Sequence, residues 1–146
     1  MVRTPKIAGS QLAAALRDSI TRLNRRLRQQ RPIGDLTITQ LSALTSLELH
    51  GALTPRELAE AERVQPPTLT KIVAKLEDRG LVQRTPHPTD GRQVILAATE
   101  SGRAVVVEHR RARDEWLAKQ LVALTPEERE VLQRAAEILG RIGRSA

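Results

Sequence analysis

The side chains most able to do chemistry in this chain are cationic and hydroxyl groups gathered between residues 66 and 92. Threonines and lysines follow a pair of prolines at short spacing, and a turn-rich segment beyond them carries two arginines and an aspartate. Such groups hydrogen-bond to phosphate oxygens and to base edges of nucleic acids. The candidate binding residues are Pro67, Thr68, Thr70, Lys71, Lys75, Arg84, Asp90 and Arg92.

Catalytic and metal chemistry find no support in the sequence. The 146 residues include no cysteine, which excludes disulfides, thiol catalysis and thiolate metal sites. The three histidines, His50, His87 and His109, do not have the spacing of metal ligands. Because no phosphate-binding glycine loop or nucleophile motif occurs either, we expect no catalytic residue, no metal and no cofactor, and therefore no enzyme.

The charge pattern favours a polyanionic partner. The formal net charge is +7, and an acidic block at residues 32–62 lies between basic blocks at residues 1–31 and 63–97. A basic face suits nucleic acid, although an arginine-rich chain can also simply be soluble. One Trp and no Phe or Tyr argue against a single-strand binder, which stacks bases on aromatic rings. No apolar run approaches the ~20 residues of a membrane span, so we expect a cytoplasmic protein without a membrane partner.

Two short helices must position the candidate residues. Thr54-Pro55-Arg56-Glu57 is a capping box with proline at the first helical position, and it predicts a helix to about Glu62. Arg63-Val64-Gln65 forms a turn, after which Pro66-Pro67 opens a second helix that ends at Arg79-Gly80. The inward stripe of this second helix is Leu69, Ile72, Val73 and Leu76. Pro67, Lys71, Ala74 and Asp78 therefore point outward, with Thr68, Thr70 and Lys75 beside them. Because nucleic acid would repel Asp78, we expect the C-terminal end of this helix to lie away from it.

A hairpin follows the second helix. Leu81–Thr85 and Gln93–Leu96 are predicted strands, and the loop of residues 86–92 is rich in turn formers. Helix, tight turn, helix and hairpin together predict a winged helix-turn-helix, whose second helix enters the major groove of duplex DNA. Taken singly, the threonines and lysines could be ordinary helix surface, Arg84 a cross-strand partner, and Asp90 with Arg92 a turn-stabilising pair.

Long helices flank this region. Apolar stripes predict helices at 11–30 and from Thr37 or Thr39 to about Gly51, then from Thr99 to about Leu124 and from Thr125 onward. The fold class is mainly α with a small β-hairpin wing. We expect residues 36–98 to bind DNA, and residues 1–35 with 99–146 to form a helical dimerisation region, because the outer stripes need a cover. An intramolecular bundle is the alternative.

The segment from Leu36 to Gly102 resembles the MarR family of bacterial transcription regulators. The resemblance rests on Leu53-Thr54-Pro55-Arg56-Glu57-Leu58-Ala59, Thr68-Leu69-Thr70-Lys71-Ile72-Val73, Leu76-Glu77-Asp78-Arg79-Gly80-Leu81-Val82 and Asp90-Gly91-Arg92. The flanking helices fit the family layout in order and length. Pro66-Pro67 departs from the pattern, since many members have a serine or another cap there.

The resemblance implies a nucleoid-associated bacterial regulator that acts as a homodimer. Each subunit of such a protein presents a recognition helix to one major groove of a pseudo-palindrome, and its wing places an arginine in the minor groove. Many members are repressors released by a small, often anionic aromatic effector that binds between the dimerisation and DNA-binding regions. Its binding residues cannot be assigned from one sequence. The alternative is a winged helix that binds another protein and reads no DNA sequence.

Arg92 is the candidate for the minor groove, where narrow A·T segments attract arginine. Asp90 lies two residues earlier, with Gly91 between them to allow a tight bend. We expect the Asp90 carboxylate to hold the Arg92 guanidinium in one direction, so that less side-chain freedom is lost on binding.

Overall fold

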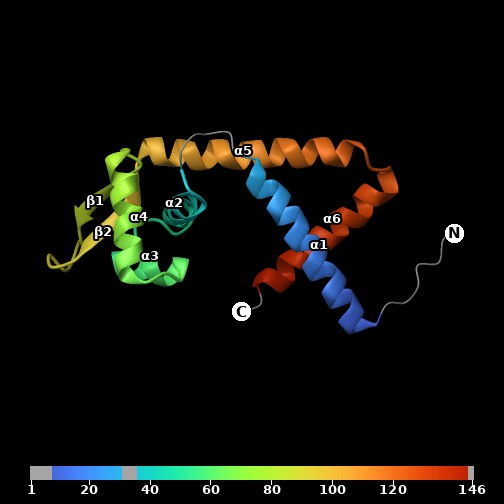
Figure 1. The fold of residues 1–146 in the computed structure, drawn as a ribbon, viewed down its shortest axis with the longest axis horizontal. Helices are drawn as coiled ribbons and strands as arrows, with labels where there is room; N and C mark the ends of the chain where they lie inside the picture. The colour runs from blue at the N-terminus through green and yellow to red at the C-terminus, as the bar shows by residue number, and fades with distance from the viewer. Residues whose placement is uncertain (1–7, 31–35, 145–146) are drawn as a thin grey trace. The chain divides into compact units, whose positions relative to one another are not determined.

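The computed structural model describes residues 8–30 and 36–144 (Figure 1). This part of the chain is mainly helical, with a two-stranded antiparallel wing between the fourth and fifth helices, as the sequence predicts. The elements are α1 (Gly9–Gln29), α2 (Ile38–His50), α3 (Pro55–Glu62), α4 (Pro66–Asp78), β1 (Val82–Pro86), β2 (Val94–Ala98), α5 (Glu100–Val122) and α6 (Pro126–Arg144).

The chain divides into two compact units. One lies within Arg31–Arg111 and contains α2, α3, α4, the wing and the first half of α5. The other contains α1, the rest of α5 and α6. Residues 1–7, 31–35 and 145–146, which belong to the predicted dimerisation region, lie outside the described residues. The functional division at residues 36 and 98 stays a prediction.

The core of the Arg31–Arg111 unit is aliphatic and joins every element of the helix-turn-helix. Leu44 and Leu47 of α2, Leu58 of α3 and Leu96 of β2 are almost fully buried. They pack with the predicted inward stripe of α4, Leu69, Ile72, Val73 and Leu76, which is buried throughout. Burying one such side chain contributes about 1.5–3 kcal/mol, so this stripe determines how α4 sits on the unit.

The wing begins and ends later than the sequence predicts. β1 pairs with β2 antiparallel, from Val82 opposite Ala98 to Pro86 opposite Val94. Leu81 is not in the strand because its N–H closes the end of α4. Leu53 adds an unpredicted bridge to the sheet, since its N–H and carbonyl bond those of Leu96 at 3.0 and 2.7 Å. Leu53, two residues before α3, therefore ties the helix-turn-helix to the wing.

The end of α4 is a Schellman cap that also receives α5. Gly80 has the left-handed φ of 68°, and the N–H of Leu81 donates to the carbonyl of Leu76 at 2.9 Å. The Thr99 hydroxyl donates to the Gly80 carbonyl at 2.6 Å, and the Thr99 N–H donates to the Leu81 carbonyl at 3.0 Å. A Cβ on Gly102 would lie 2.1 Å from the Leu81 carbonyl oxygen, so only glycine fits there.

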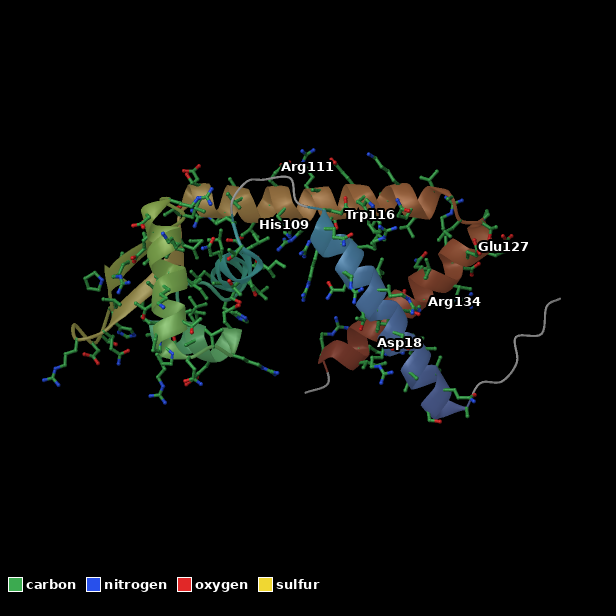
Figure 2. The ribbon with its side chains drawn as sticks, viewed as in Figure 1. Asp18, His109, Arg111, Trp116, Glu127 and Arg134 are labelled. Carbon is green, nitrogen blue, oxygen red and sulfur yellow. The ribbon has the colours of Figure 1, made fainter. Side chains whose placement is uncertain are left out.

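The helices of the other unit carry apolar stripes without burying them. Neither α1 nor α6 has a buried residue in the described chain. The exposed large apolar side chains of these helices are Leu12, Leu16, Ile20, Leu23, Val131, Leu132, Ile138 and Ile142. Their polar residues pair locally, as Asp18 does with Arg17 at 3.2 Å and Arg134 with Glu130 at 2.7 Å (Figure 2). None of the described helices is long and apolar enough to cross a membrane.

We expect Gly102→Ala to lower the free energy of unfolding by about 1–3 kcal/mol, because overpacking against a backbone carbonyl forces α5 away from the end of α4. Urea denaturation measures this change. Gly143→Ala in α6 is the matched control, since its Cβ meets nothing within 4 Å. The control should leave stability unchanged or raise it slightly, because alanine favours helix. Equal stability of the Gly102→Ala variant and the wild type would contradict the close approach.

Candidate nucleic-acid interface

The capping box at the start of α3 is formed as predicted. The Glu57 N–H donates to the Thr54 hydroxyl oxygen at 3.2 Å, and the Thr54 N–H donates to the Glu57 carboxylate at 2.7 Å. These hydrogen bonds with Thr54, the backbone one foremost, lower the pKa of Glu57. The carboxylate is thereby committed to the helix end, and its charge offsets the positive end of the α3 dipole.

The turn between α3 and α4 is closed by backbone bonds around a strained residue. Arg63 takes the left-handed conformation with φ 53° although it is not glycine. Its N–H donates to the Glu60 carbonyl at 3.2 Å, and the Val64 N–H donates to the Ala59 carbonyl at 3.1 Å. The same pair of bonds closes the end of α4 at Gly80, so both helices of the motif end in a Schellman cap.

The outward face of α4 carries most of the candidate residues. Pro67, Thr68, Lys71 and Lys75 are all exposed, opposite the buried stripe. The Thr70 hydroxyl donates to the Pro66 carbonyl at 3.0 Å, which leaves its oxygen lone pairs as acceptors. The predicted face therefore exists as a surface, and whether these side chains touch DNA stays a prediction.

Arg84 lies against α4 through an ion pair that the sequence analysis missed. Its Nε donates to Oε1 of Glu77 at 2.8 Å, and its Nη2 approaches Oε2 at 3.5 Å. Arg84 is also a cross-strand partner, as the alternative interpretation has it: it lies opposite Leu96 in the β1–β2 pair. Glu77 lies in a helix and Arg84 in a strand seven residues later, so no single periodicity connects them. They meet only because the wing packs on α4.

The wing tip corrects the expectation for Asp90. Its Oδ1 accepts the backbone N–H of Arg92 at 3.1 Å, and its Oδ2 accepts the side-chain amide of Gln93 at 3.3 Å. The carboxylate therefore holds the turn and makes no ion pair with the Arg92 guanidinium in the described chain. A two-residue spacing favours this bond, because an aspartate reaches the backbone N–H two residues on. Asp90 acts on Arg92 through its backbone.

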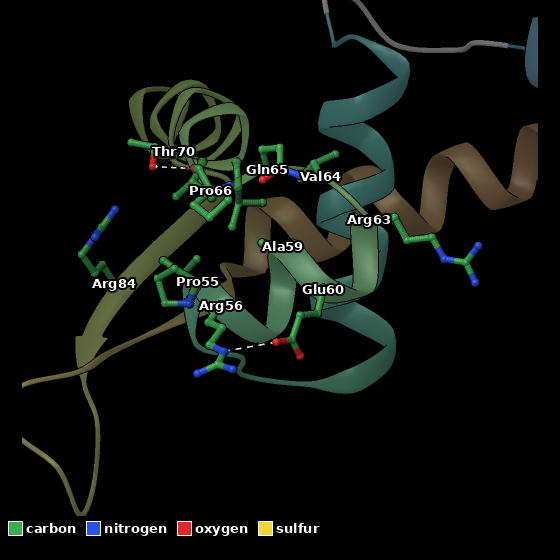
Figure 3. Close-up of a pocket in the computed structure, with 13 residues that line it drawn as sticks. Pro55, Arg56, Ala59, Glu60, Arg63, Val64, Gln65, Pro66, Thr70 and Arg84 are labelled. Atoms are coloured by element: carbon green, nitrogen blue, oxygen red, sulfur yellow. Dashed lines mark hydrogen bonds and ion pairs between the residues drawn. The ribbon is translucent and has the colours of Figure 1, made fainter.

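A pocket of about 780 Å³ lies between α3, α4 and the wing (Figure 3). Its apolar wall includes Pro55, Ala59, Leu69 and Val73. The Thr70 hydroxyl and the Arg84 guanidinium supply polar groups at its edge. Thr70 and Arg84, two of the candidate residues, therefore line one cavity on the flank of α4. The sequence did not predict this cavity, because its lining residues come from separate elements.

These elements define a winged helix-turn-helix, and comparisons with known proteins agree. A family model described as MarR family matches residues 36–94. The chain is 47% identical to an HTH-type transcriptional regulator of Mycobacterium tuberculosis, over 89% of this chain and 91% of that protein. It is 33% identical to the HTH-type transcriptional repressor MdtR of Bacillus subtilis, over 76% and 70% of the two chains. A crystal structure of a protein from Pseudomonas aeruginosa aligns with a TM-score of 0.84 at 32% identity, covering 97% and 100%.

The chain therefore belongs to the MarR family of HTH-type transcriptional regulators. It is a regulator and not an enzyme. The family resemblance and the fold class expected from the sequence are both confirmed.

The wing-tip geometry generates a test for Asp90. Asp90→Ala removes the acceptor of the Arg92 N–H and should weaken duplex DNA binding by about 1 kcal/mol, the typical worth of one hydrogen bond. Asp90→Asn keeps an oxygen at the same place and removes a negative charge, so it should bind as tightly as the wild type or more tightly. Fluorescence anisotropy with labelled duplex measures both. Tighter binding by Asp90→Ala would show that only charge matters at this residue.

Proposed function

We propose that this chain binds a specific double-stranded DNA operator through α4 in the major groove and Arg92 in the minor groove. The observation that carries the proposal is the exposed face of α4, where Lys71 and Lys75 stand opposite a fully buried stripe. Neither lysine, nor Arg92, forms an ion pair in the described part of the chain, so all three charges are available to phosphate or bases. An α-helix of this kind fits the width of the major groove.

We propose further that the bound form represses transcription. The support is the name of MdtR, a repressor of Bacillus subtilis with 33% identity to this chain. A protein seated on an operator excludes other proteins from the same DNA, so occupancy alone is sufficient for repression. Transcription in vitro tests this, with a promoter that contains an operator found by selection from random duplexes. Added protein should lower the yield of transcript.

A homodimer is the proposed working form. The exposed stripes of α1 and α6 support it, because eight large apolar side chains on helices without a buried residue need a cover. A two-fold dimer would present two copies of α4 and would match a pseudo-palindromic operator. Light scattering at micromolar concentration should give the mass of two chains. The mass of one chain would leave the intramolecular bundle as the explanation.

Lys71 provides the sharpest test of sequence readout. A good bidentate base contact is worth about 1–3 kcal/mol of discrimination, and a lysine contact lies near the lower end. Lys71→Ala should therefore weaken binding to the operator, found by selection from random duplexes, more than binding to a random duplex. Lys119→Ala, an exposed lysine of α5, is the matched control and should change neither. Equal losses on both duplexes would mean that Lys71 contacts phosphate only.

Salt dependence separates DNA binding from the alternative of a protein-interaction module. Three cations per subunit, Lys71, Lys75 and Arg92, amount to six per dimer. Counterion release then predicts that log K falls with log salt with a slope of about −5. Affinity for duplex DNA that does not respond to salt, or no affinity, would favour the interaction module.

An anionic aromatic effector is the remaining proposal, and the pocket beside α4 supports it. Arg56, Arg63 and Arg84 are among the residues that line this largely apolar cavity, and cationic side chains beside apolar walls suit a carboxylate on an aromatic ring. Because Thr70 and Arg84 belong to both the pocket and the proposed interface, an occupant would favour the DNA-free form. Titrating benzoate and hydroxybenzoates into the DNA complex should release the duplex. Unchanged affinity across a broad set of aromatic acids would count against an effector of this class.

A further inference from the structure

The imidazole of His87 organises the loop at the tip of the wing. The backbone N–H groups of Thr89 and Asp90 both donate to its Nδ1 at 3.2 Å, and the Thr89 hydroxyl lies 3.3 Å from the same nitrogen. A backbone N–H can only donate, so Nδ1 must carry a lone pair. The ring is therefore neutral in this arrangement, with its proton on Nε2.

The Nδ1 acceptor of His87 and the carboxylate of Asp90 hold successive parts of the same loop. His87 holds the N–H of Asp90, and the Asp90 carboxylate holds the N–H of Arg92. The N–H of His87 donates to the Gln93 carbonyl, and the N–H of Gln93 donates to the Asp90 carbonyl, both at 3.0 Å. The backbone from residue 87 to residue 93 is thus held by two side-chain acceptors, and the direction in which Arg92 leaves the loop depends on both.

We propose that neutral His87 is a positioning residue for DNA binding: its Nδ1 lone pair shapes the wing tip that presents Arg92, and protonation of the ring weakens the complex with duplex DNA. The inference rests on the proposed function of the wing. A proton on Nδ1 would point an N–H at two other N–H donors, so the loop must change conformation or lose both bonds.

The positive charge that a protonated ring gains would by itself favour DNA binding. The direction of the pH effect on affinity therefore distinguishes the two causes. Glu57 of α3 interacts electrostatically with the imidazole, and Asp90 and Arg92 are the charged residues of the loop itself. A positive ring near DNA would also attract phosphate. Electrostatics alone therefore predicts tighter DNA binding at low pH, whereas loss of the Nδ1 acceptor predicts weaker binding.

The experiment compares pH profiles of affinity for the selected duplex at constant salt, from pH 8 to about pH 5.5. Wild-type affinity should fall about three- to tenfold, the factor that one net hydrogen bond represents. His87→Asn keeps a short acceptor that does not titrate, so it should retain the affinity at pH 8 and lose the pH dependence. His50→Asn, at the exposed end of α2, is the matched control and should follow the wild type.

Nitrogen NMR of the free chain supplies a readout that needs no DNA. At pH 8 the His87 ring should be the Nε2–H tautomer, and the amide signals of Thr89 and Asp90 should move as the ring titrates. A proton on Nδ1 at pH 8, or wild-type affinity that rises on acidification, would overturn the inference. Failure to bind any duplex, together with an Nε2–H ring, would instead refute the proposed function and leave the loop geometry standing.

Discussion

α4, the wing and the start of α5 meet at the backbone of Gly80 and Leu81. There α4 ends in a left-handed glycine, β1 begins one residue later, and Thr99 bonds both carbonyls at the point where β2 gives way to α5. Gly102 lets α5 approach to a distance that any side chain would prevent. Because β1 starts and β2 ends at this junction, the wing cannot shift against α4 without breaking bonds to the start of α5.

Three of the acidic residues around the interface are held by specific partners, and this shapes its charge. Glu57 bonds the start of α3, Glu77 pairs with Arg84, and Asp90 bonds the wing-tip backbone. Exposed carboxylates engaged in this way are poor partners for the lysines of α4. Lys71, Lys75 and Arg92 therefore keep their positive charge, although Asp78 is exposed at the end of α4 and an acidic block precedes them in the chain.

The pocket and the proposed DNA-binding surface share one flank of α4. Thr70 and Arg84 line the cavity, while Lys71 lies on the adjoining exposed face. The Glu77–Arg84 pair holds the wing against the helix next to that cavity. A molecule in the pocket would therefore meet residues whose positions also define the distance between α4 and the wing, the two elements proposed to bind DNA.

The sequence by itself determined the order of the elements and most of their bounds. The prolines and capping boxes that start α3 and α4, the buried stripe of α4 and the glycine that ends it are signals that act within one or two helical turns. These signals also located the exposed face of α4, because helical periodicity assigns each residue a side. The hydrogen bonds that form the helix caps join residues a few positions apart, so the sequence alone is enough to recognise the caps.

Only the tertiary structure decided how the remaining side chains are used. The pairing of Glu77 with Arg84, the bridge from Leu53 to Leu96 and the close approach at Gly102 depend on how the wing and α5 pack on α4. Asp90 was assigned to the Arg92 guanidinium on spacing, but its oxygens bind the Arg92 backbone and Gln93 instead. The reason is physical: a carboxylate has several donors within reach in a turn, and which of them it meets is set by the three-dimensional course of the loop.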